Sequence, residues 1–280
     1  MLKYCLLFII LAAGGFSAWY GMEHYDELVS YVNPSHKEGP ILTFEAAYTP
    51  EEIMQRHEKE LLKGHNHAYG KASVKFLPFL LMDVKYSKAD KSTQEAQLIW
   101  NLENGEMVLD TQTFDTTHGF EDCINAKALD DDFRILHALQ RHGGKATKEA
   151  LAAELGMDQA VLFDRLEALR KKHLVAIKLD TVRIHLESPL LQVQPQTRIY
   201  HYFVTKNVLA ESQIAQRYSK DQIRKIAKAA FGPDFAIRSE HLLFVPIFQI
   251  NIQNPDGSTL KTYWNAITGK KIELKRFWIK

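Results

Sequence analysis

The hexapeptide WNAITG, residues 264–269, decides the fold, because a close copy of it, WNLENG, occurs at residues 100–105. Each copy follows an apolar run with one proline in it, LPFLL at 77–81 and VPIFQI at 245–250. A helical pattern precedes each apolar run and begins after Thr49 in the first copy and after Ser219 in the second. This shared order of elements indicates an internal repeat.

Each copy is expected to form one helix packed on antiparallel strands. Three residues at i, i+4 and i+8 give each helix one inward face. They are Ile53, His57 and Leu61 in the first copy and Ile223, Ala227 and Phe231 in the second. The run NPDG at 254–257 predicts a tight turn between two strands. The glycines at the ends of the two hexapeptides predict further reversals. We place the first copy at 46–127 and the second at 191–280.

The stretch from VPIF at 245–248 through WNAITGK at 264–270 resembles the PepSY family. Members of this family are small extracytoplasmic α+β modules. The resemblance covers about half of the chain, and it implies two PepSY-like units of helix plus antiparallel sheet. Some PepSY proteins modulate peptidases, so one function that the resemblance implies is that of a peptidase modulator. This inference rests on fold-level association alone.

Residues 128–190 show a different pattern, helix, helix-turn-helix and then β-hairpin. Helical periodicity follows the acidic run at 130–132, a second short helix ends at Gly156, and a third extends from Gln159 to Lys172. Two alternating strands, 174–179 and 182–186, complete the order. The frame LAxxLG at 151–156 resembles the winged helix of bacterial transcription regulators. The fold class is therefore α+β, two PepSY-like units with a winged-helix domain between them.

The third helix argues for a protein contact rather than for DNA. In a DNA-binding winged helix its first half enters the major groove. Here that half carries Gln159, Phe163 and Asp164, and an aspartate repels phosphate while a phenylalanine cannot hydrogen-bond to base edges. Arg170, Lys171 and Lys172 lie at its carboxyl end, where they complement the helix dipole. These six residues form the predicted interaction surface.

Composition supports a non-enzymatic interpretation. The 280 residues carry 35 basic and 34 acidic side chains, a net charge of +1, so no overall basic field attracts nucleic acid. Two cysteines cannot supply a disulfide framework or a four-cysteine zinc site. Cys123 has no identifiable histidine partner for nucleophilic catalysis, and no phosphate loop or metalloprotease motif occurs. His57, His65 and His67 are weak metal candidates without a completing ligand. We expect no cofactor.

Residues 4–22 lack charge over about nineteen positions, close to the length that spans a bilayer. Trp19 and Tyr20 stand at the far end, where aromatic rings favour the headgroup region. Lys3 precedes the segment and the next basic residue is Lys37, which predicts a cytoplasmic amino terminus. Residues 1–22 are therefore expected to anchor the chain in the bilayer, with 23–45 as a linker. A cleaved signal peptide is the alternative.

Together these patterns predict a single-pass protein of the bacterial inner membrane, with an extracytoplasmic part that binds a protein partner as a scaffold or interaction component. The alternative is a membrane-tethered winged-helix transcription regulator, and a PepSY-type peptidase modulator is the second. The sequence leaves the partner, the pathway and the oligomeric state open.

Overall fold

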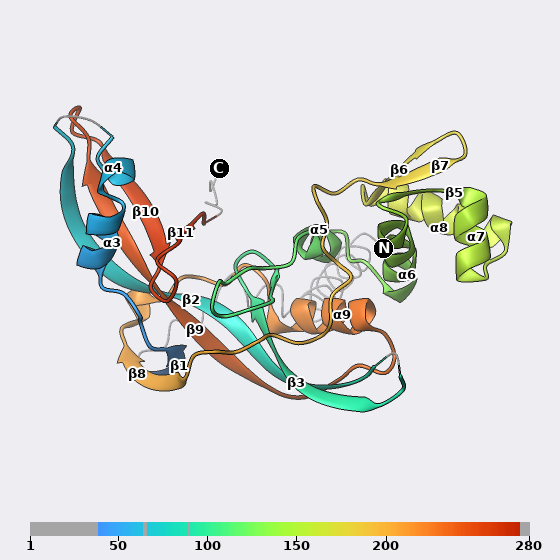
Figure 1. The fold of residues 1–280 in the computed structure, drawn as a ribbon, viewed down its shortest axis with the longest axis horizontal. Helices are drawn as coiled ribbons and strands as arrows, with labels where there is room; N and C mark the ends of the chain where they lie inside the picture. Colours follow the sequence, from blue (N-terminus) through green and yellow to red (C-terminus); the bar gives the residue numbers. More distant parts are fainter. Residues whose placement is uncertain (1–38, 64–65, 89, 275–280) are drawn as a thin grey trace, which may run out of the picture.

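The computed structural model of the chain describes residues 39–63, 66–88 and 90–274. It is a mixed α+β structure built on one large sheet, which confirms the predicted α+β class (Figure 1). Among the described residues, no helix has the length and apolarity needed to cross a bilayer. The predicted anchor at 4–22 and the metal candidate His65 lie outside the described residues.

The two copies share a single sheet. Its main path is β11 (Lys271–Ile272), β10 (Thr259–Asn265), β9 (Ala236–Gln253), β2 (Ala68–Ser87), β3 (Thr93–Asn101) and β4 (Met107–Val108). β1 (Gly39–Phe44) lies off this path and pairs with both β8 (Phe203–Val208) and β9. Residues 39–44, which were expected to be linker, therefore form a strand of the sheet.

A pseudo-twofold axis relates the copies. The long strands β2 and β9 run antiparallel at the centre of the sheet, and Leu77 of one copy lies opposite Val245 of the other. The two prolines follow this symmetry, because Pro78 lies opposite Phe244 while Pro246 lies opposite Phe76. The duplicated sequence thus folds as two halves joined edge to edge.

The asparagine of each hexapeptide makes the same hydrogen bonds in both halves. The side-chain oxygen of Asn101 accepts the backbone N–H groups of Glu103 and Asn104, and that of Asn265 accepts those of Ile267 and Thr268. The glycine that ends each hexapeptide has a φ of +75° in the first copy and +68° in the second. Glycine tolerates this left-handed region, so both predicted reversals are confirmed.

The prolines explain how each helix begins. The Leu102 N–H donates to the Pro78 carbonyl at 3.0 Å, but proline has no N–H to return to Leu102. The free Leu102 carbonyl instead accepts the N–H groups of Arg217 and Tyr218, at 2.8 and 2.9 Å, just before the second helix. Because proline has no N–H group, the carbonyl of the residue opposite it is free. That carbonyl binds the backbone of the segment that leads into a helix.

The same exchange occurs in the other half. The Ala266 N–H donates to the Pro246 carbonyl, and the Ala266 carbonyl accepts the N–H groups of Ala47 and Tyr48. The helix that follows is α3 (Pro50–Arg56), continued by α4 (Glu58–Leu61). A capping box of Thr49 and Glu52 begins α3. The segment entering each helix is thus bound to the hexapeptide of the opposite copy.

Each helix also packs mainly on the opposite copy. Ile53 of α3 belongs to a buried cluster with Phe248 and Trp264 of the second copy. Correspondingly, α9 (Lys220–Phe231) buries Ile223 in a cluster with Trp100 of the first copy. The helix faces predicted from the sequence are confirmed, but the expectation that each helix packs on its own copy's strands is not. The reason is that β2 and β9 are long enough to pass under both helices.

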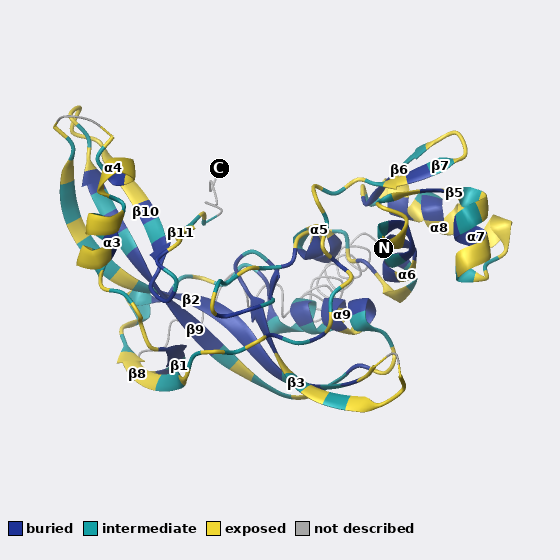
Figure 2. Cartoon of the chain, in the orientation of Figure 1, coloured by how far each residue is buried: buried dark blue, intermediate teal, exposed yellow. Residues whose placement is uncertain are grey.

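The inserted unit lies at one end of the sheet (Figure 1). It contains α6 (Asp130–Arg141), β5 (Lys145–Thr147), α7 (Lys148–Leu155), α8 (Gln159–Lys171), β6 (Val175–Lys178) and β7 (Thr181–Ile184). The predicted order of three helices and a hairpin is present, and β5 joins the hairpin in a three-stranded sheet. Its core is continuous with that beneath α9 and α5 (Phe120–Asn125), whereas much of α7 and α8 is exposed (Figure 2).

Between β8 and α9 lies the short 3-10 helix η1 (Ala210–Ser212).

Candidate protein-interaction surface

The side chains of α8 divide into a buried and an exposed face. Asp158 caps the helix by accepting the Ala160 N–H at 2.8 Å. Leucines at 162, 166 and 169 point into the core, as their spacing predicts. Consequently Gln159 and Asp164 are exposed, and Phe163 keeps 49% of its surface in contact with solvent. Val161 is 51% exposed as well, but two residues away on the helix it lies on the other flank of the buried Leu162.

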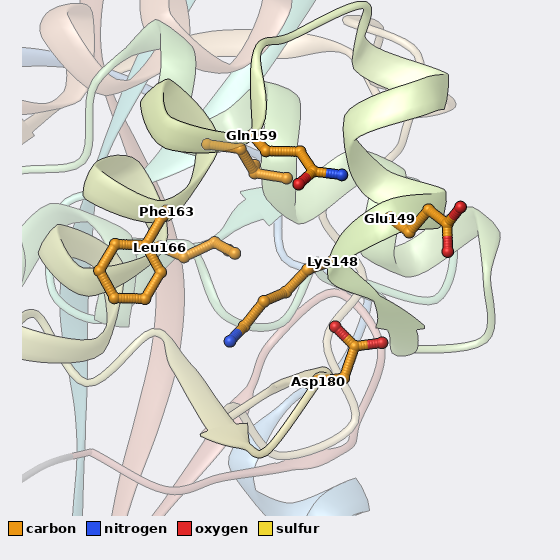
Figure 3. A pocket seen from close by; sticks show the side chains of 7 residues that line it. Lys148, Glu149, Gln159, Phe163, Leu166 and Asp180 are labelled. Carbon is orange, nitrogen blue, oxygen red and sulfur yellow. The ribbon is translucent and has the colours of Figure 1, made fainter.

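A pocket of about 300 Å³ adjoins this exposed face. Figure 3 shows that its walls come from the first turn of α7, from α8 and from the turn between β6 and β7. Its lining residues are Lys148, Glu149, Gln159, Leu162, Phe163, Leu166 and Asp180. The pocket therefore combines an apolar wall with charges of both signs.

Lys148 is the central charge of this pocket. Its ammonium lies 5.5 Å from the centre of the Phe163 ring, within the range of a cation–π interaction. The Lys148 backbone N–H donates to the Asp180 carbonyl at 2.9 Å, which fixes the hairpin turn beside the helix. In Figure 3 the lysine side chain extends toward the space between Phe163 and Asp180. A ligand entering here would meet an aromatic ring and a cation together.

The predicted surface is therefore split. Gln159 and Phe163 line the pocket, whereas Asp164 lies on the exposed side of α8 and is not among the lining residues. The basic residues at the other end of the helix do not form a free cationic track. Arg170 pairs with Glu167 at 2.7 Å, and Lys172 pairs with Asp132 of α6 at 2.5 Å. Lys171 is exposed between them.

Sequence reasoning missed Lys148, Glu149 and Asp180 as partners of Phe163. They come from a different helix and from the hairpin turn, and no local motif connects them. The only signal was the expected order of elements, which brings a hairpin next to the third helix.

The described histidines among the metal candidates have other neighbours. His57 packs on the ring of Trp264, with 4.4 Å between ring centroids, and its Nδ1 lies 3.7 Å from Glu60. His67 lies in the loop before β2. In the described part of the chain, no three His, Cys, Asp or Glu side chains are grouped as metal ligands.

Cys123 lies on α5 and is fully buried. Burial, with the negative charges of Asp122 and Glu106, raises the pKa of its thiol far above the ordinary value. A thiol held in its protonated form is a poor nucleophile. Its environment is that of a core residue.

Comparison of the chain with protein-family models, with curated proteins and with solved structures finds no match.

Proposed function

We propose that the chain is a membrane-anchored, non-enzymatic interaction protein of a bacterial envelope, with its folded part outside the cytoplasm. In this proposal residues 4–22 span the inner membrane and the two copies form PepSY-like halves of a rigid support. Residues 128–190 form a winged-helix unit that binds a protein partner. The element order helix, strand, helix, helix and hairpin supports this assignment of the inserted unit.

The observation that carries the proposal is the character of the α8 surface. Phe163 exposes apolar area, and the pocket that it lines offers Lys148 with two carboxylates. Exposed aromatic side chains next to polar groups are typical of the centres of protein interfaces. The fitting partner is a protein segment that places an apolar side chain against Phe163 and polar groups near Lys148.

The ion pairs argue against the transcription-regulator alternative. Phosphate binding requires basic side chains that are free to replace counterions. Arg170 and Lys172 are each within 2.7 Å of a carboxylate, and Arg165 is 2.9 Å from Asp131. This end of α8 therefore presents locally compensated charge instead of a cationic surface.

Site-specific photo-crosslinking in cells tests the proposed surface. A photoreactive phenylalanine analogue at position 163 of the full chain should form one discrete protein adduct, which the additional change Lys148→Glu should abolish. Leu260 on β10 is a matched control, because it is 46% exposed but lies on the large sheet. Equal adducts from both positions would contradict a specific surface.

Two further measurements separate the alternatives. A reporter fused after Lys280 should be active only outside the cytoplasm, and a cytoplasmic signal would refute the proposed topology. The purified chain should not retain duplex DNA at low salt. Salt-sensitive retention that is lost in a Lys171→Ala variant would instead favour the membrane-tethered regulator.

A further inference from the structure

The three-stranded sheet of the inserted unit has one covered face and one open face. Ala146 on β5, Val182 on β7 and Val175 on β6 are buried in the core of the unit. Because side chains alternate along a strand, the residues next to them in the sequence point away from this core. In two paired rows these outward residues are Lys145, Arg183 and Ala176, and then Thr147, Thr181 and Lys178. These six positions of the open face carry three cations and no acidic side chain.

The three cations have no counterion within the described part of the chain. Lys145 and Arg183 lie directly opposite each other on adjacent strands, and like charges in this arrangement destabilise a sheet. Among the described residues, neither of them forms an ion pair, nor does Lys178, and all three are exposed. By contrast, ion pairs hold four other basic residues of the unit, Arg141, Arg165, Arg170 and Lys172. An anionic surface is the complement that the open face lacks.

The turn at the end of this sheet exposes a leucine. Leu179 lies between β6 and β7, and 88% of its surface is accessible to solvent. Its φ of +55° lies in the left-handed region, where a bulky side chain is strained and asparagine or glycine is favoured. Figure 1 shows the hairpin extending from the inserted unit, and Figure 2 shows that its turn is exposed. Backbone strain persists mainly at functional sites, so this leucine indicates an apolar contact.

We propose that the open face of this sheet binds the surface of an anionic phospholipid membrane. Lys145, Lys178 and Arg183 contact the headgroup phosphates, and Leu179 enters the boundary between headgroups and acyl chains. Charge complementarity supports this occupant, because basic side chains combined with an apolar tip are typical of proteins that bind the membrane surface. Asp180, the acidic residue of the turn, lines the α8 pocket (Figure 3). The proposal does not depend on the protein contact at Phe163, which is not part of the open face.

Duplex DNA is the other large polyanion that a cationic face can meet. The turn of the hairpin lines the same pocket as α8, so a duplex on the sheet would also meet that helix. There Asp164 is exposed and repels phosphate, and Arg170 is already paired with Glu167. A membrane requires only the sheet and its turn, and is therefore the occupant that these charges favour.

The test uses the full chain held in phosphatidylcholine nanodiscs, with separate lipid vesicles as the probe. Flotation on a density gradient measures binding to vesicles of phosphatidylglycerol and phosphatidylcholine in equal parts. One basic residue near anionic lipid contributes about fivefold to binding, so Lys145→Gln, Lys178→Gln and Arg183→Gln should each weaken it by that factor. All three together, or pure phosphatidylcholine vesicles, should weaken binding by about a hundredfold. Leu179→Asn should weaken it several-fold without lowering the melting temperature, because asparagine tolerates the left-handed φ.

Two matched variants on the large sheet control for the substitutions themselves. Lys261→Gln and Leu260→Asn make the same chemical changes at exposed positions of β10 and should leave vesicle binding unchanged. Equal binding to both kinds of vesicle would overturn the proposal, as would unchanged binding when all three cations are replaced in a chain that thermal melting shows to be folded. Retention of duplex DNA without vesicle binding would overturn it in favour of nucleic acid. These comparisons share residues 4–22 in every sample, so they are independent of the membrane topology that the reporter fusion tests.

Discussion

Glu106 makes the stability of the protein depend on pH in a way that one substitution can isolate. It directly follows the first hexapeptide, and only 7% of its surface is exposed. One carboxylate oxygen accepts the N–H groups of Gly119 and Glu121, each at 3.0 Å. The other accepts the Thr117 hydroxyl at 2.7 Å. Burial outweighs these hydrogen bonds and raises the pKa of Glu106 to about 7.

The shift from the ordinary value of 4.5 to about 7 corresponds to about 3 kcal/mol. The pKa of Glu106 is higher in the folded protein than in the unfolded one. Its contribution to the free energy of unfolding is therefore fully present below pH 4.5. This contribution is lost as the pH rises through about 7. The contribution of Glu106 to the free energy of unfolding should therefore fall between pH 4.5 and about 7.

The informative variant is Glu106→Gln. Its amide oxygen can still accept the N–H groups of Gly119 and Glu121, and its NH2 group can donate to the Thr117 oxygen. It is neutral at every pH, so the variant should gain about 3 kcal/mol relative to the unaltered chain between pH 4.5 and 8. Urea unfolding of both chains at a series of pH values measures this difference, in which other titrating groups cancel.

Glu106→Ala is the companion variant. It leaves two backbone N–H groups without their acceptor and should destabilise the protein by about 2–4 kcal/mol at low pH. Parallel stability curves for the unaltered chain and Glu106→Gln would refute the assignment of a raised pKa to Glu106.

Three other substitutions test the fold and the α8 surface. Ile53→Ala should cost about 2–4 kcal/mol and change the emission of Trp264 rather than that of Trp100, which single-tryptophan chains can distinguish. Asn265→Ala removes the oxygen that accepts two backbone N–H groups, and should lower the free energy of unfolding by about 1–3 kcal/mol in urea titrations. Phe163→Ala should change the melting temperature little, because a surface substitution costs within about 0.5 kcal/mol. It should abolish adduct formation from a photoreactive residue at position 159, which lines the same pocket.

Local patterns predicted the parts of the fold that depend on local chemistry. The spacing of Leu162, Leu166 and Leu169 was sufficient to place Phe163 on the outside of α8. The repeat identified both tryptophan strands and both glycine reversals. In each case the decisive interaction lies within a few residues along the chain.

The exchange of helices between copies could not be predicted in the same way. The periodicity of α3 gives its apolar face but does not say whether Trp100 or Trp264 covers it. The position of α3 depends on the Ala266 carbonyl, which lies opposite Pro246 and is far from the helix in the sequence. Likewise, α6 of the inserted unit packs against α9 of the second copy, a contact without a local motif.

The symmetry of β2 and β9 has a consequence for the history of the chain. A polypeptide with one copy alone would expose the whole edge of a long apolar strand and would leave its helix without most of its packing surface. Two such polypeptides would satisfy both needs by pairing about a twofold axis and exchanging helices. The single chain thus has the architecture of a fused homodimer. In one half Glu106 stands where Lys270 stands in the other, and the unit inserted between the two halves breaks the symmetry.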